Sequence, residues 1–282
     1  MFVFMVLLSK KLCMSMTRFR TKPNGNILTI KTLIEILKVL TKERRSPLDT
    51  AIKLNDFELV KYFIEINPEN VNAIITEAGS TPLHRSVWCG YEDIVKFLLE
   101  NGANVNAYNK YGFTPLHVAD NENEINIVKM LIQNGADINA KQDYERTPLH
   151  FAVNEQKLGI VKTLIQMGAN VNARDVNKWT PLHFAACWNQ TYVVELLLEN
   201  GAEINAKHCG GRTPLFFAAE NKRLEVIKIL IQNGADLNVQ DNHGCTVLHL
   251  VTSLNNVEIA EILLQHSANT ELQRDTTITP FF

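Results

Sequence analysis

The sequence lacks the residue patterns that point to a disulfide framework, a metal centre or a common enzyme class. Its five cysteines (Cys13, Cys89, Cys187, Cys209 and Cys245) are odd in number and form no Cys-x-x-Cys pair. It also has no Gly-rich phosphate loop, no His-Glu-x-x-His and no Gly-x-Ser-x-Gly. We therefore expect reduced thiols in a cytoplasmic or nuclear compartment, no cofactor, no metal and no enzymatic activity.

Long apolar runs are also missing. The longest stretch at the N-terminus covers residues 1–8, and about 20 apolar residues are needed to span a membrane. Residues 1–34 hold six Lys/Arg and no acidic residue, a composition weakly similar to that of a targeting peptide. We rank three interpretations of residues 1–26: first a disordered leader, second a start site misplaced upstream of Met14 or Met16, and third a targeting peptide.

The chain has little net charge, −2, but the charge is unevenly distributed. Residues 1–45 carry ten basic and two acidic residues, whereas the remainder carries 18 basic and 28 acidic residues. An acidic body is a poor nucleic-acid binder, because that affinity rests on neutralising phosphates. The acidic residues indicate solvated helix faces; if they contribute to function, the partner is basic.

The most informative pattern is a repeat of 33 residues. Thr-Pro occurs at Thr81, Thr114, Thr147, Thr180 and Thr213, while Thr246-Val247 and Thr279-Pro280 continue the step and Ser46-Pro47 begins it. A glycine and an asparagine recur in the same register (Gly102, Gly135, Gly168, Gly201 and Gly234; Asn106, Asn139, Asn172, Asn205 and Asn238). A fixed period over this length indicates a stack of like units that pack mainly on their neighbours.

One unit, residues 179–207, shows what each copy is expected to form. Thr180 is a good helix N-cap, and Pro181 suits the first helical turn. A polar break at Asn189 precedes a second apolar segment, and Gly201 stands where that helix would end in the left-handed conformation. The unit therefore reads as helix, turn, helix and extended loop.

The chain resembles the ankyrin-repeat family, whose Thr-Pro-Leu-His pattern stands at 81–84, 114–117, 147–150 and 180–183. The resemblance implies an all-α solenoid of stacked helix-turn-helix units with projecting β-hairpin-like loops. It also implies a non-catalytic protein that binds another protein on a concave face. We place seven repeats in residues 46–278 (46–80, 81–113, 114–146, 147–179, 180–212, 213–245 and 246–278), after an N-terminal capping helix at 27–45, for which a membrane-surface helix is the alternative.

The two ends depart from the pattern. In the first repeat Leu48-Asp49 replaces Leu-His, and in the seventh Val247 replaces the proline and Ser267 the glycine. Residues 279–282 begin an eighth unit and stop. Either the chain is cut short, or it is a fragment, or the seventh repeat is itself the cap. We expect a monomer, with self-association through the uncapped end, near Ile259, Ile262 and Leu263, as the alternative.

Two repeated residue types suggest chemistry, and for both a structural role is the preferred interpretation. The row His84, His117, His150, His183 and His249 is too widely spaced for one zinc ion, since stacked helices lie about 8–10 Å apart. The resemblance implies that each of these histidines bonds to the threonine of its own motif. His183 and Cys187 share a helix face, but Cys187 varies between repeats. Asn139 and Asn172 resemble the acceptor of asparaginyl hydroxylases, and whether they are modified stays open.

The positions that vary between repeats are the candidates for partner contacts. Aromatic and arginine residues dominate binding hot spots, and at loop tips and first-helix ends they are Trp88, Tyr111, Phe113, Tyr144, Arg146, Trp179, Trp188 and Arg212. For Phe113 and Trp179, which directly precede an N-cap threonine, packing onto neighbouring segments is an equal alternative. The predicted function is a protein-interaction scaffold or inhibitor; the alternative is the recognition arm of a larger assembly.

Overall fold

The computed structural model describes residues 46–119 and 125–272. The predicted leader at 1–26, the predicted capping helix at 27–45 and the start of an eighth unit at 279–282 lie outside the described residues. Within them, no helix has the length and apolar character needed to cross a membrane.

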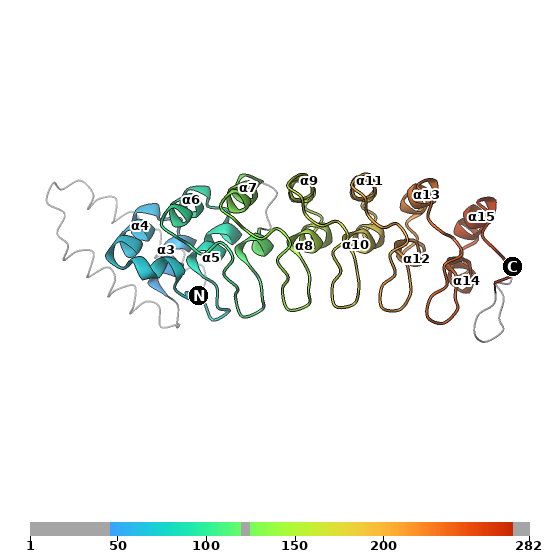
Figure 1. Cartoon of the computed structure of the whole chain (residues 1–282), viewed down its shortest axis with the longest axis horizontal. Coiled ribbons are helices and arrows are strands. Elements are labelled where there is room, and N and C mark those ends of the chain that lie inside the picture. The colour runs from blue at the N-terminus through green and yellow to red at the C-terminus, as the bar shows by residue number, and fades with distance from the viewer. Residues whose placement is uncertain (1–45, 120–124, 273–282) are drawn as a thin grey trace, which may run out of the picture.

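The described residues form an elongated stack of helix pairs (Figure 1). The first helices of successive pairs lie side by side in one layer, the second helices form another layer, and the loops project from the first-helix side. The first members are α3 (Pro47–Lys53), α5 (Pro82–Cys89), η2 (Pro115–Val118), α8 (Pro148–Asn154), α10 (Pro181–Cys187), α12 (Pro214–Glu220) and α14 (Val247–Ser253). The second members are α4 (Phe57–Ile66), α6 (Glu92–Glu100), α7 (Ile125–Gln133), α9 (Leu158–Gln166), α11 (Thr191–Glu199), α13 (Leu224–Gln232) and α15 (Val257–Gln265), and a 3-10 turn, η1 (Pro68–Asn72), follows α4.

The helix boundaries follow from the repeated residues. Thr180 has extended backbone angles at the N-cap, and Pro181 occupies the first helical turn, where its missing N–H leaves no bond unmade. After α11, Gly201 adopts φ +83°, the left-handed conformation that glycine reaches without steric cost. The equivalent Gly102, Gly135, Gly168 and Gly234 have φ between +84° and +92°, so the predicted helix ends are confirmed.

The loops resemble hairpins, although the described residues contain no β-strand. In each of five loops the N–H of the first residue donates to the carbonyl four residues later, as from Asp175 to Trp179 at 3.0 Å. Neighbouring loops are also joined through their backbones, as from the N–H of Val176 to the carbonyl of Tyr144 at 3.0 Å. These bonds hold adjacent loop tips in fixed positions relative to one another.

One continuous apolar core runs along the stack between the two helix layers. Its most regular row comes from the second helices and is almost completely shielded from solvent (Leu98, Leu131, Leu164, Leu197 and Leu230). No helix of seven to ten residues is stable alone in water, so each pair depends on the apolar face of its neighbours.

The third pair departs from the expected pattern, because its first helix is not α-helical. The prediction of an α-helix there was wrong: η2 is a 3-10 helix of four residues that ends at Val118. The residues that follow supply a reason. Where the other pairs bury Val87, Val153 or Ala186 in the last turn, the third has Asp120, followed by a polar run to Glu124. Burial of an unpaired carboxylate would destabilise a longer helix here.

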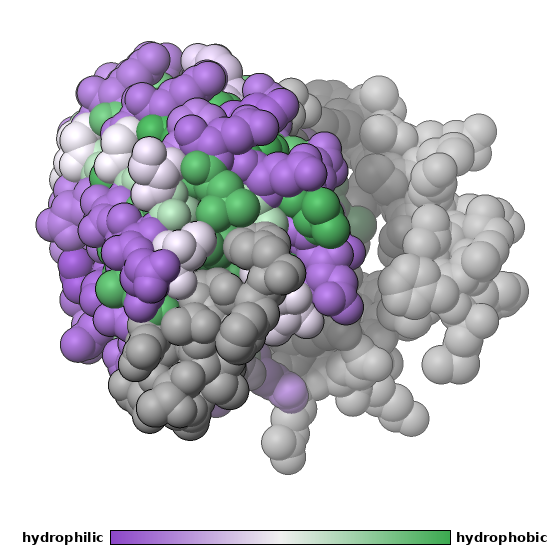
Figure 2. Space-filling view, turned by 90° about the vertical axis from the view of Figure 1, so that its right-hand side faces the viewer, coloured by the Kyte–Doolittle hydropathy of each residue, from purple (hydrophilic) through white to green (hydrophobic). Residues whose placement is uncertain are grey.

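The last pair presents apolar surface at the C-terminal end of the stack. Figure 2 faces this end and shows hydrophobic residues near its centre, with hydrophilic residues above and to the left of them. The exposed apolar side chains of this pair are Leu254, Val257 and Leu264. Of the three residues expected near an uncovered end, Ile259 and Leu263 are fully buried in the core, so that expectation was wrong for them, and Ile262 is partly buried against the core.

Candidate protein-binding surface

The repeated histidines hold the backbone of the candidate surface in place. Each one lies in the first turn of a first helix, where Nδ1 accepts the backbone N–H of the motif threonine, at 3.1 Å in the case of His150 and Thr147. Nε2 of the same ring lies 3.1 Å from the carbonyl oxygen of Trp179, in the next loop. Equivalent bonds reach the carbonyls of Phe113, Arg146 and Arg212. Four of the eight predicted contact residues are therefore anchored by a histidine.

The hydrogen bonds also define the tautomer of these histidine rings. A backbone N–H only donates, so Nδ1 is the acceptor and Nε2 carries the proton that is donated to the carbonyl. Burial lowers the pKa of His117, His150 and His183 to about 4, and that of His84 in the same direction. The rings are neutral at pH 7 and act as structural bridges between repeats.

Phe113, Arg146, Trp179 and Arg212 form a row at one repeat position, facing the next loop and the first helices. The Nε groups of Arg146 and Arg212 donate to the buried carboxylates of Asp175 and Asp241, each at 3.1 Å. Burial acts to raise the pKa of Asp241, but the N–H groups of His243 and Cys245 and the Arg212 guanidinium outweigh it, so this pKa lies below its ordinary value.

The two aromatic members of this row pack onto the scaffold. The Trp179 ring lies 4.3 Å from the Phe217 ring and 4.9 Å from the Phe184 ring, between α10 and α12. The Phe113 ring lies 5.0 Å from that of Phe151 on α8. Both residues are half-buried. Both side chains therefore pack onto neighbouring helices, as the alternative interpretation expected, and each residue remains partly exposed.

The other aromatic candidates are well exposed. The exposed fraction is 66% for Tyr144, 59% for Tyr111, 56% for Trp88 and 47% for Trp188. Trp188 caps the C-terminus of α10, and its Nε1 donates to Oδ1 of Asn154 at 3.3 Å. Its indole is thereby oriented by the end of α8 while much of the ring remains open to a partner.

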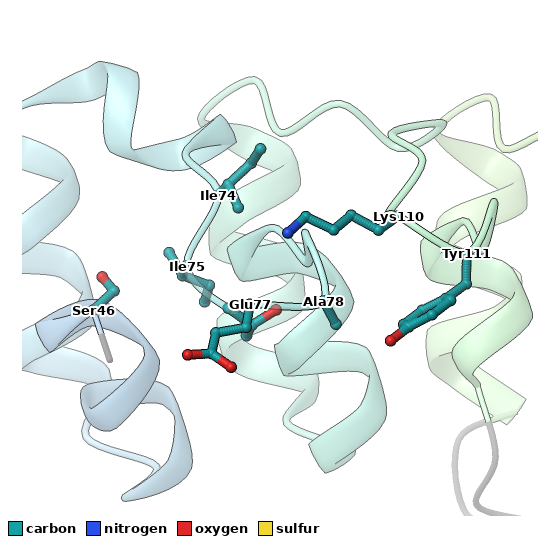
Figure 3. A pocket seen from close by; sticks show the side chains of 8 residues that line it. Ser46, Ile74, Ile75, Glu77, Ala78, Lys110 and Tyr111 are labelled. Atoms are coloured by element: carbon teal, nitrogen blue, oxygen red, sulfur yellow. The ribbon is translucent and has the colours of Figure 1, made fainter. Parts of the chain in front are cut away.

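The structure separates the candidates into groups. Tyr111 points toward the preceding loop and borders a hollow of about 1070 Å³ whose described lining includes Ile74, Ala78 and Lys110 (Figure 3). Trp88 lies on α5, and the guanidinium carbon of Arg85 lies over its indole, 5.2 Å from the centroid of the ring. Trp88 and Trp188 do not occupy equivalent positions in their repeats, because Trp88 comes one residue earlier, counted from the motif threonine. Tyr144, Arg146, Trp179, Trp188 and Arg212 come from the consecutive loops and helices around α8 to α12.

Sequence reasoning missed the side chains that orient the candidates. Asp175 and Asp241 were not singled out, although they share a repeat position with Asn109, Gln142 and His208, all of which cap their own loop. This row of polar acceptors in register was a usable signal. Asn154, which orients Trp188, had no signal, because its role depends on a contact between two helices.

The loop asparagines join successive repeats. Nδ2 of Asn172 donates to the Gly201 carbonyl at 2.8 Å, and its Oδ1 accepts the N–H of Glu203 at 2.8 Å. Oδ1 of Asn139 accepts the N–H of Asn170 in the same way. These bonds give the asparagines a structural role, and hydroxylation of Asn139 or Asn172 remains an untested prediction.

A metal or catalytic centre has no support in the described part of the chain. No group of three or more His, Cys, Asp or Glu side chains there is placed to hold a metal ion. His183 is occupied by its two structural bonds. Burial raises the pKa of the Cys187 thiol, the opposite of what an activated nucleophile requires.

Comparison with known proteins identifies the repeat. Models of ankyrin repeats match residues 20–109, 140–208 and 205–274, and a further one matches residues 98–152. The solved ankyrin repeat domain of Bcl-3, a unique member of the IkappaB protein family, is similar over 72% of this chain and 93% of that one, with a TM-score of 0.67 and 30% identity.

Curated relatives match over shorter stretches. They include the ankyrin repeat domain-containing protein OPG015 of monkeypox virus (33% identity over 28% of this chain and 17% of that protein) and myotrophin of Xenopus tropicalis (40% over 19% and 44%). The acyl-CoA-binding domain-containing protein 6 homolog of Dictyostelium discoideum matches at 36% identity over 30% of each chain. The matches thus span less than half of each relative. The repeated motifs, the stacked helix pairs and these similarities agree that the chain belongs to the ankyrin-repeat family.

Proposed function

We propose that this chain is a non-catalytic scaffold or inhibitor that binds a partner protein on the concave face of the repeat stack. We define that face by the loop tips and the C-terminal ends of the first helices, from Tyr111 to Arg212. Trp88 forms its N-terminal border. Ankyrin repeats are generally a protein-interaction fold, and this proposal assigns the contact to particular residues.

The observation that carries the proposal is the exposure of Tyr144 and Trp188 at positions that the scaffold does not need. At the repeat position of Tyr144 the other loops have Tyr111, Asn177, Gly210 and His243, so packing does not dictate the residue. An exposed aromatic ring costs solvation in the free protein and gives large contact area in a complex. Arg146, Trp179 and Arg212 belong to the same repeats and are held in place by Asp175, Phe217 and Asp241 respectively.

The test compares two surfaces of the same protein. The variant carrying Tyr144→Ala and Trp188→Ala is expected to keep its helical circular dichroism and melting temperature, because neither side chain is buried. It should lose the partner that the unaltered chain captures from a cell lysate, as identified by mass spectrometry. Tyr192→Ala is the matched control: this tyrosine is 48% exposed on α11, a second helix, where its ring covers Lys162.

If the double variant captures the partner as well as the unaltered chain, the assignment of the concave face is wrong. Loss of capture by Tyr192→Ala alone would place the contact on the second-helix layer instead.

The recognition arm of a larger protein or assembly remains the second candidate. It is supported by exposed apolar side chains of the last pair, Val257 and Leu264. A chain whose aggregation is relieved by an added C-terminal segment in size-exclusion chromatography would favour it, whereas a stable monomer would favour a self-sufficient binder.

A further inference from the structure

Arg146 and Arg212 occupy the same repeat position but differ in the number of carboxylates they hold. In both, Nε donates to a buried aspartate of the next loop. Arg212 also reaches a second carboxylate, because its Nη1 lies 3.4 Å from Oε1 of Glu220, the last residue of α12. This site demonstrates that one guanidinium at this repeat position accommodates two carboxylates.

The second carboxylate is missing at Arg146. The residue that corresponds to Glu220 is Asn154, the last residue of α8, whose amide is engaged with Trp188 and with Oε1 of Glu155. Among the described residues, the structure gives the Nη groups of Arg146 no hydrogen-bond or ion-pair partner, and its side chain is one-third exposed.

The surroundings of these Nη groups are suited to a protein segment. The guanidinium carbon of Arg146 lies 4.9 Å from the centroid of the Phe184 ring, so aromatic packing and the Asp175 bond both fix its plane. A guanidinium held in one plane presents paired N–H donors that match the two oxygens of a carboxylate. The half-exposed indole of Trp188, at the end of the neighbouring helix α10 and bonded to Asn154 itself, provides apolar surface.

We propose that the partner places one Asp or Glu carboxylate on the Nη groups of Arg146 and an adjacent apolar side chain on Trp188. The carboxylate takes the position that Glu220 has beside Arg212. Glu155 is exposed and accepts a hydrogen bond from Asn154, so it lies beside the site and repels further acidic groups. The matching segment therefore has a single carboxylate among apolar and basic residues. This inference rests on the proposed function, since it specifies what the concave face recognises.

The test uses random 12-residue peptides displayed on phage and selected on the full-length chain. The expected consensus is one Asp or Glu next to an aliphatic or aromatic residue. A synthetic peptide with that consensus is then titrated against variants. Asn154→Glu supplies Arg146 with the carboxylate that Arg212 already has, leaves the Arg146–Asp175 pair intact, and should weaken binding about tenfold or more.

Matched variants separate the specific effect from a general one. Ser253→Glu adds the same charge at the same repeat position of α14, where Cys245 stands in place of an arginine, and should change affinity less than about twofold. Arg146→Gln should weaken binding as Asn154→Glu does. Arg174→Gln, which removes an exposed arginine that pairs with Glu203 and is not a proposed contact residue, should not. Circular dichroism checks that each variant is folded.

The outcomes distinguish this inference from the proposed function. If the selected peptides carry no common carboxylate, or bind Asn154→Glu as tightly as the unaltered chain, the role of Arg146 is overturned and the concave face still stands. Failure to select any peptide likewise counts against a peptide carboxylate at Arg146. If the peptides bind equally well to the Tyr144→Ala/Trp188→Ala variant and to Arg146→Gln, the concave face itself is wrong. If only Arg146→Gln weakens binding, the apolar contact with Trp188 is overturned.

Discussion

At the scale of single residues, the repeated histidine of the Thr-Pro-Leu-His motif holds the loop backbone that carries the contact side chains. Its Nδ1 ties the ring to the threonine that starts its helix, and its Nε2 proton reaches the next loop. Phe216 replaces this histidine in the sixth repeat, where the ring is buried and bonds to no carbonyl. An apolar ring is therefore tolerated at this position in one repeat. That repeat lacks the hydrogen bond that elsewhere joins the first helix to the following loop.

The neutral state of these rings predicts how stability depends on pH. The unfolded chain binds protons on histidine below about pH 6.5, whereas His117, His150 and His183 stay neutral in the folded chain down to about pH 4. The contribution of these neutral histidines to the free energy of unfolding is fully present above pH 6.5 and is lost as the pH falls toward 4. The loss is at most about 3 kcal/mol per histidine.

Urea unfolding followed by circular dichroism between pH 7 and 4 measures this loss. The variant His150→Phe, which copies the phenylalanine that the sixth repeat has at Phe216, should show a shallower pH dependence. A free energy of unfolding that is constant from pH 7 to 4.5 would contradict the buried neutral state.

At the scale of elements, a helix pair is defined more by its neighbours than by its own propensity. The described α-helices have seven to ten residues, too few to persist alone. The Thr-Pro start and the left-handed glycine define where each begins and ends, and the buried leucine row holds it against the next pair. The third pair shows the limit of this arrangement, since its first helix shortens where the apolar pattern is interrupted.

The leucine row predicts the effect of truncating a side chain in a second helix. Leu197 on α11 is completely buried, so Leu197→Ala is expected to cost about 2–5 kcal/mol of the free energy of unfolding. Glu195→Ala, on the exposed side of the same helix, should change it by less than about 0.5 kcal/mol. Equal effects in a denaturant titration would show that α11 does not pack as described.

At the scale of the whole molecule, stability depends on position along the stack. The pair α10 and α11 packs between α8 and α9 on one side and α12 and α13 on the other. Among the described elements, α14 contacts α12 and has no further first helix beyond it. In repeat proteins the stability of a unit depends on its intrinsic stability and on the interfaces with its neighbours.

Hydrogen exchange tests this difference. The helices α11 and α15 have nine residues each, yet amides of α15 should exchange faster, because opening this pair breaks fewer interfaces. Exchange followed by mass spectrometry compares the two helices in one experiment. Equal protection would mean that the end of the stack is covered as well as its middle.

The architecture of this protein can be predicted from its amino-acid pattern alone. A period of 33 residues with Thr-Pro, glycine and asparagine in register specifies where each pair starts, where its second helix ends and which face it buries, because these are local properties of backbone and solvent exposure. The same pattern indicates the variable aromatic positions, Tyr144 and Trp188 among them, as candidates for contact.

How those side chains are used depends instead on contacts that form in the folded chain. Trp179 packs between α10 and α12, the two arginines pair with aspartates 29 residues away, and Asn154 orients Trp188 across a helix boundary. The difference between Arg146 and Arg212 likewise depends on the residue at the end of a helix, Asn154 or Glu220. Such contacts join residues that are distant in sequence, and side-chain packing between neighbouring repeats determines them rather than any local pattern.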